Sequence, residues 1–325
     1  MDQRRISKII RSICDHSGDQ ITLNNISEKD FNEIAETVGL KEGSLPIRYF
    51  YNAEISSIIV RSNASPIHES TIPFFQEVTT VSHSHLQGIL SSCRVIQGGA
   101  CKFELYHDNV DSTPWMKAKV PDLSLEVTID GVKESESPYP TIVVEVGYSR
   151  SYENLLGDIE AWLLGSLGHI KCGILVKLEK PASDGNFGDI ARWKGFVEVW
   201  HRAERAISTL KVSKALYPDD GVHRGKAVQY GKRIAFLPPH DTVPQLILSV
   251  AHFLPIGLIP ASRIRETIQV PLDRLIDNCR NKIQDMVTLT EYAKDSQTRC
   301  RRRCDYDLSL LGTGPDSPPM AKRVK

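Results

Sequence analysis

The segment that most constrains the fold is Thr141–Val146, TIVVEV, which is apolar almost throughout. A run of this kind is typical of a central β-strand that is covered on both faces. Glu145 lies inside it, and burying an unpaired carboxylate costs several kcal/mol. We therefore expect Glu145 to have a charged partner, a raised pKa or a bound metal ion.

The preceding segment, Pro121–Asp130, alternates apolar and polar residues like a strand and is followed by the polar loop GVKESESP. A hairpin centred between Lys133 and Glu134 would place Asp122 opposite Glu145 at one end of a sheet. The sequence thus predicts that two carboxylates meet at a sheet end.

Beyond Gly147 the pattern changes to a helix over Tyr152–Leu164 and then to a second buried strand, Gly173–Leu178. A strand–helix–strand unit predicts a right-handed crossover and two parallel strands. Because open α/β sheets place their sites beyond the carboxyl ends of parallel strands, Lys177 is expected in the same crevice.

Charge is balanced overall, with 40 Lys and Arg against 40 Asp and Glu, but it is segregated locally. Residues 121–160 hold nine acids and two bases, whereas residues 186–233 hold ten bases and five acids with interleaved aromatic residues. Carboxylate oxygens suit Mg²⁺, and basic residues near aromatic rings suit a nucleic-acid strand. This combination favours metal-assisted phosphodiester hydrolysis.

Four motifs follow one another along the chain: Pro121-Asp122, PTIVVEVG around Glu145, Ser149 with Ser151, and a helix with Asp158 and Trp162. Together they resemble the core of the PD-(D/E)XK nuclease superfamily. The closest resemblance is to an uncharacterised fungal branch and a related bacterial family. It implies an α/β, restriction-endonuclease-like core with a mixed central sheet flanked by helices. It also implies that Asp122 and Glu145 bind Mg²⁺ or Mn²⁺, with help from the Val146 carbonyl. An acid on a preceding helix often assists, for which Glu77 is a weak candidate.

The resemblance also implies a lysine that activates water, and here the sequence departs from the pattern. Gly147 stands two residues after Glu145, where that lysine belongs, and Ile159 stands at the alternative position on the helix. Lys177 and Arg150 remain, and arginine activates water poorly because it does not deprotonate. Two functions stay open: a metal-dependent nuclease acting on DNA or RNA through Asp122, Glu145 and Lys177, or a degenerate fold kept as a nucleic-acid- or protein-binding module.

Four regions are predicted along the chain: an N-terminal helical region 1–65, the α/β core 66–260 with extra strands, a C-terminal helix within 261–311 and a disordered basic tail 312–325. Pro271 is expected to open the C-terminal helix. Its apolar stripe is expected to pack on the body or on a second copy, and comprises Leu272, Leu275, Cys279, Ile283 and Met286.

The seven cysteines are odd in number and scattered, which indicates a reducing compartment. The N-terminal MDQRRISKII lacks an apolar segment of signal-peptide length. The longest apolar stretch, Val243–Ala261, contains three prolines and is not expected to span a membrane. We therefore expect an intracellular protein of the nucleus or cytoplasm, without a membrane partner.

The terminal cluster Lys322-Arg323-Val324-Lys325 follows a proline-rich stretch, as nuclear import signals do. A fluorescent fusion that lacks residues 320–325 should therefore accumulate less in the nucleus than the intact fusion. Equal distribution of the two fusions, measured by microscopy, would contradict an import role.

Overall fold

The computed structural model describes twelve stretches of the chain. These are residues 20–37, 48–53, 55–61, 69–98, 101–105, 116–132, 137–148, 150–166, 168–181, 189–203, 226–239 and 241–288. The first nineteen residues of the predicted N-terminal region, Ser149 and the basic tail lie outside these stretches.

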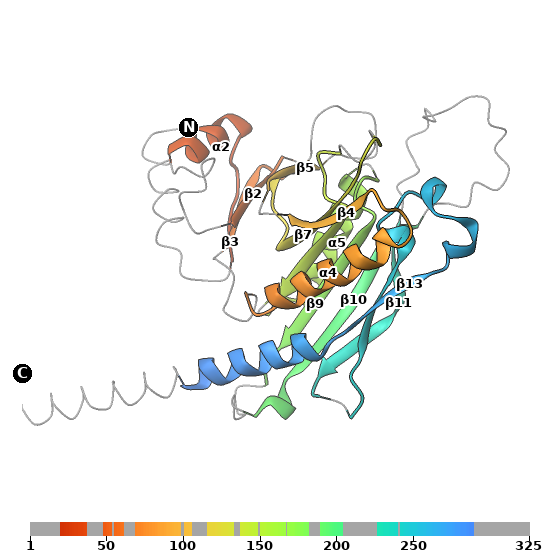
Figure 1. Cartoon of the computed structure of the whole chain (residues 1–325). Coiled ribbons are helices and arrows are strands. Elements are labelled where there is room, and N and C mark those ends of the chain that lie inside the picture. The colour runs from red at the N-terminus through yellow and green to blue at the C-terminus, as the bar shows by residue number, and fades with distance from the viewer. Residues whose placement is uncertain are drawn as a thin grey trace, which may run out of the picture.

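The centre of the molecule is a six-stranded mixed sheet (Figure 1). In spatial order its strands are β11 (Lys226–Leu237), β10 (Lys194–Ala203), β9 (Cys172–Glu179), β8 (Ile142–Gly147), β7 (Leu123–Ile129) and β4 (Cys93–Gly98). Strands β8 and β9 are parallel and are joined by helix α5 (Tyr152–Gly165), while the other neighbours pair antiparallel. The expected mixed α/β architecture with a central sheet flanked by helices is confirmed.

The hairpin register also follows the sequence-based expectation. Leu123 pairs with Val144 and Leu125 with Ile142, which is the register that carries Asp122 to the level of Glu145. Strand β8 is buried along its whole length, as its composition predicts.

The two faces of the sheet carry different layers because successive strand residues point to opposite sides. Ile142, Val144 and Val146 belong to a core shared with helix α4 (Ile72–Gln87) and the C-terminal part of the chain. Val143 belongs to a second core formed with α5. Glu145 therefore points to the α5 face.

A second sheet, not expected from the sequence, is built mainly from the N-terminal region. Its order is β1 (Gln20–Leu23), β3 (Ser57–Arg61), β2 (Arg48–Asn52), β6 (Met116–Lys119) and β5 (Phe103–Leu105). The prediction that region 1–65 is helical is therefore wrong, because its described residues form three strands and one helix. That helix is α2 (Glu28–Thr37), and Ser27 Oγ accepts a hydrogen bond from the Asp30 amide at its start. Since β6 pairs with β2, hydrogen bonding crosses the predicted 65/66 boundary.

The C-terminal helix begins later in the chain than predicted. Strand β12 (Gln245–Ser249) pairs with β13 (Thr267–Pro271), across the predicted 260/261 boundary. Pro271 is the last strand residue rather than the first helical one, and the helix occupies 273–288 of the described chain. A proline is tolerated there because β13 pairs with a single strand and leaves an edge.

The apolar stripe of this helix packs against the body of the same chain. Leu275, Cys279 and Ile283 are buried in the α4-side core, and Met286 packs against it. Self-association is therefore not needed to cover the stripe. No helix among the described residues is long and apolar enough to cross a membrane.

A cluster of rings joins this C-terminal part to the main sheet. His252 is 4 % exposed and lies against Tyr230 of β11 and His201 of β10, with ring centroids 4.7 and 5.9 Å away. Its Nδ1 accepts a hydrogen bond from the Ser249 amide. Burial, and secondarily the neighbouring His201, lowers the pKa of His252 to about 4.

The fold should therefore lose stability in mild acid. An unfolded histidine titrates near 6.5, so the unfolded chain binds more protons than the folded one between pH 6.5 and 4. The free energy of unfolding should fall as pH drops through this window, by about 3 kcal/mol at most. Urea titrations at several pH values should show this loss, and His252→Asn should flatten it; an equal slope in the variant would contradict the assignment.

Candidate functional site

Strand ends bring Asp122 and Glu145 together, as the hairpin predicts. Asp122 Oδ2 accepts a hydrogen bond of 2.6 Å from the Val146 amide, the residue next to Glu145. The β8–β9 register sets Gly147 opposite Lys177, so Lys177 stands one step further along the same face. All three sequence-predicted site residues thus lie at one end of the sheet.

Glu145 is completely buried, and both of its carboxylate oxygens have partners from the helix side. Oε1 accepts from the indole Nε1 of Trp162 at 2.6 Å. Oε2 lies 3.5 Å from Nη1 of Arg150, in the turn that leads into α5. Ser151 caps that helix by accepting from the Asn154 amide, which places Arg150 at its start.

The network continues beyond Arg150 to a second buried pair of charges. Arg150 Nη2 also donates to Asp158 Oδ2, and Asp158 Oδ1 accepts from Lys119 Nζ at 2.6 Å. The Lys119 ammonium lies 5.2 Å from the Trp162 ring centroid, and its side chain is 1 % exposed. Two carboxylates and two cations therefore neutralise one another under α5.

Lys177 contacts the backbone rather than these carboxylates. Its ammonium donates to the carbonyls of Tyr148 and Leu178, at 3.3 and 3.2 Å. Burial lowers the pKa of Lys177 below its usual value; the carboxylates of Glu179 and Glu153 oppose this shift and Arg150 adds to it.

The two positions that the resemblance assigns to a lysine are both closed by packing. A Cβ at Gly147 would lie 2.1 Å from Leu155 Cδ1, so any side chain there would require the buried side chain of Leu155 to move. Ile159 is fully buried and packs directly over Gly173 of β9. Glu77 lies on α4, in the layer on the other face of the sheet, and pairs with Arg274 at 3.7 Å.

These residues do not fit a divalent ion. Glu145 is engaged by Trp162 and by a permanent cation, Arg150, and one oxygen of Asp122, Oδ2, accepts from a backbone amide. Among the described residues, no three His, Cys, Asp or Glu side chains converge on a common metal position. The guanidinium of Arg150 balances the carboxylates of Glu145 and Asp158.

A second buried carboxylate on the same face repeats this arrangement. Glu198 of β10 accepts from Tyr152, Trp200 and Arg233, at 3.0, 3.1 and 2.7 Å. Arg233 also lies over the ring of Phe196, 3.9 Å from its centroid. Burial and then Glu198 raise the pKa of Tyr152.

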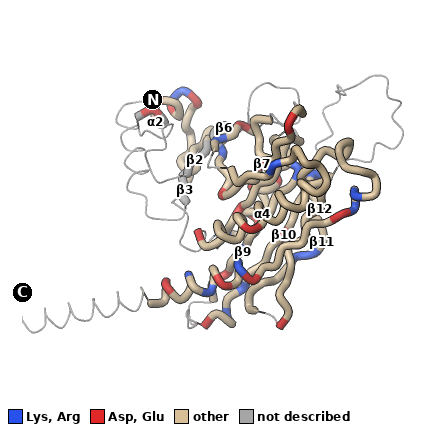
Figure 2. Tube along the Cα trace, in the orientation of Figure 1, with Lys and Arg blue, Asp and Glu red and all other residues tan. Residues whose placement is uncertain are grey.

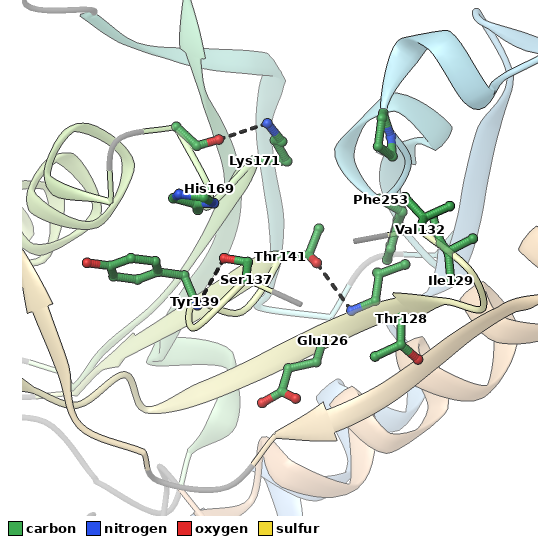
Figure 3. Close-up of a pocket in the computed structure, with 13 residues that line it drawn as sticks. Glu126, Thr128, Ile129, Val132, Ser137, Tyr139, Thr141, His169, Lys171 and Phe253 are labelled. Carbon is green, nitrogen blue, oxygen red and sulfur yellow. Dashed lines mark hydrogen bonds between the residues drawn. The ribbon is translucent and has the colours of Figure 1, made fainter. Parts of the chain in front are cut away.

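A pocket of about 350 Å³ opens at the opposite end of the sheet (Figure 3). It lies where β7 and the start of β8 separate, next to the turn between α5 and β9. Its lining includes Val132, Tyr139, Thr141, His169, Lys171 and Phe253. The sequence does not predict this pocket, because its residues come from four separate segments.

Comparison with known proteins finds no family model that matches this chain. A search of curated proteins also finds no match.

Removing Arg150 should destabilise the fold strongly. Arg150→Met leaves Glu145 and Asp158 buried without their shared cation, a change that typically costs about 3–5 kcal/mol. As a control, Arg94→Met breaks an exposed pair with Asp130, whose side chains are 65 % and 64 % exposed, and should cost about 0–1 kcal/mol. Adding Glu145→Gln to Arg150→Met should recover part of the loss. Equal midpoints for the two arginine variants in urea unfolding would argue against the network.

Proposed function

We propose that this chain is a nuclease-like fold that binds nucleic acid without cleaving it. The observation that carries the proposal is the double use of Arg150, which neutralises Glu145 and Asp158 where a nuclease would hold a divalent ion. A buried guanidinium keeps its charge at all physiological pH values. It therefore serves the fold as a fixed counter-ion.

The packing around the strand ends supports the same proposal. Leu155 fills the space beside Gly147, and the Lys177 ammonium is held by two carbonyls. A water-activating base must reach a water molecule beside the reacting phosphate. Lys177 is 6 % exposed and directed at the backbone, which suits a structural role.

Support for a nucleic-acid partner comes from the edge of the main sheet. Strands β10 and β11 carry five Lys and Arg residues and one carboxylate, Glu198, which is buried. We call these five the basic stripe: Lys194, Arg202, Lys226, Lys232 and Arg233. Figure 2 colours the described Lys and Arg residues blue along the whole tube. Positive side chains along an edge suit the regularly spaced phosphates of a nucleic acid.

Metal-dependent cleavage is the second candidate, and one observation favours it. Asp122, Glu145 and Lys177 share one end and one face of the sheet, as the hairpin and the strand–helix–strand unit predict. For cleavage, Arg150 would have to leave Glu145, which makes metal binding the discriminating measurement.

We expect millimolar Mg²⁺ or Mn²⁺ to leave the melting temperature of the protein unchanged. A ligand that binds only the native state stabilises it by RT ln(1 + [L]/Kd), about 2.7 kcal/mol at a hundredfold excess over Kd. The same samples should leave labelled DNA and RNA intact. A metal-dependent rise that Glu145→Ala abolishes, together with cleavage that Lys177→Ala slows, would establish the nuclease instead.

Binding itself is tested with fluorescent oligonucleotides at low salt. Lys226→Ala combined with Lys232→Ala should weaken binding by roughly tenfold, because two phosphate contacts are lost. Lys29, an exposed lysine of α2, provides the matched control. If wild type binds neither DNA nor RNA, or if the double variant binds as well as Lys29→Ala, the proposal fails.

A further inference from the structure

The pocket in Figure 3 is connected to the basic stripe. Gly168 lines the pocket and takes a positive φ of +84°, and a Cβ added to it would come 3.7 Å from Nη1 of Arg202. The guanidinium of Arg202, a member of the stripe on β10, therefore stands beside the pocket wall. Lys226 pairs with Ala203, the next residue of β10, so Lys226 lies at the same end of the sheet as Arg202.

The two walls of the pocket differ in chemistry. On one side lie Tyr139 and His169, whose rings stack at 5.5 Å and 17°, and Tyr139 stacks in turn on Phe103 at 5.8 Å. On the other side lie Val132 and the buried Phe253 (Figure 3). Such walls suit a flat, partly apolar group, because ring faces stack on one another and aliphatic surface covers the other side.

The lining carries one carboxylate, Glu126, and one cation, Lys171. The Lys171 ammonium is exposed and donates to the Gly168 carbonyl at 2.8 Å, which uses one of its three donors. Burial, and then Lys171, lowers the pKa of His169, so the imidazole is neutral at pH 7 and offers a ring face rather than a charge. Ser137 and Thr141 add hydroxyl groups to the lining.

We propose that this pocket binds one nucleotide, with its base between the Tyr139–His169 wall and the Phe253 wall and its phosphate at Lys171 and Arg202. A volume of about 350 Å³ is at the small end of ligand pockets, which span roughly 300–1,000 Å³, and therefore suits a single unit rather than a stretch of strand. The nucleotide is either free or part of a strand that follows the basic stripe. The second alternative rests on the function proposed above, and the first does not.

The test uses the full chain and titrates adenosine and uridine monophosphates by calorimetry. Adenosine and inorganic phosphate serve as probes for the two halves of the ligand. Lys171→Ala should weaken monophosphate binding by roughly tenfold or more, since a charge-assisted hydrogen bond is lost. His169→Ala should weaken it by about fivefold or more, and His169→Phe should restore it, since base stacking on an aromatic ring is retained.

Lys180 provides the matched control, because Lys171 precedes strand β9 and Lys180 follows it at the far end. Lys180→Ala should bind the monophosphates as wild type does. Proton NMR adds a second measurement: the bound phosphate should raise the pKa of His169. The proposal is overturned if the monophosphates do not bind, if inorganic phosphate binds equally well, or if Lys171→Ala matches Lys180→Ala.

An oligonucleotide competition separates the two sources of the nucleotide. Displacement of bound monophosphate by single-stranded DNA or RNA assigns the pocket to a strand and supports both proposals. Monophosphate binding without such displacement assigns it to a free nucleotide, and the pocket proposal then stands even if the nucleic-acid function fails.

Discussion

The burial of charge beneath α5 is the constraint on which the rest of the structure depends. Glu145 stands fully buried in an interior strand of the sheet, and a carboxylate there must be compensated before the strands can pack. Arg150, Asp158 and Lys119 provide that compensation through a chain of contacts from the main sheet through α5 to strand β6. One electrostatic requirement thereby fixes the position of the helix and of the second sheet relative to the first.

The same requirement explains why the sequence does not distinguish carboxylates that bind a metal ion from carboxylates that are paired with buried cations. Asp122, Glu145 and Lys177 lie at one end of the sheet, and the partners of their side chains are an amide, an indole with a guanidinium, and two carbonyls. A site for hydrolysis must keep carboxylate oxygens available to a cation and to water. Here protein donors contact both oxygens of Glu145 and one oxygen of Asp122.

The sequence was informative where interactions are local and uninformative where they are distant. The β7–β8 hairpin and helix α5 were predictable because apolar runs, a polar loop and the Ser151 cap mark their limits. Lys119 was missed because it meets Asp158 across 39 residues and from another sheet. Pro271 was assigned to a helix start because nothing nearby reveals that its segment pairs with β12. The strands of the second sheet are short, and each finds its partner only in the folded chain.

Arg233 has a consequence for any polyanion that meets the edge of this sheet. Although it is 48 % exposed, its charge is balanced by Glu198 and its guanidinium is stacked on Phe196. Arg233 is therefore one of the cations of β11, but it contributes less to the positive electrostatic potential at the edge than an unpaired cation would. Nucleic-acid affinity falls with the logarithm of salt concentration in proportion to the counter-ions released. The number of counter-ions released on nucleic-acid binding should therefore be smaller than the number of Lys and Arg side chains along the edge. The buried carboxylate of Glu198 accounts for the difference.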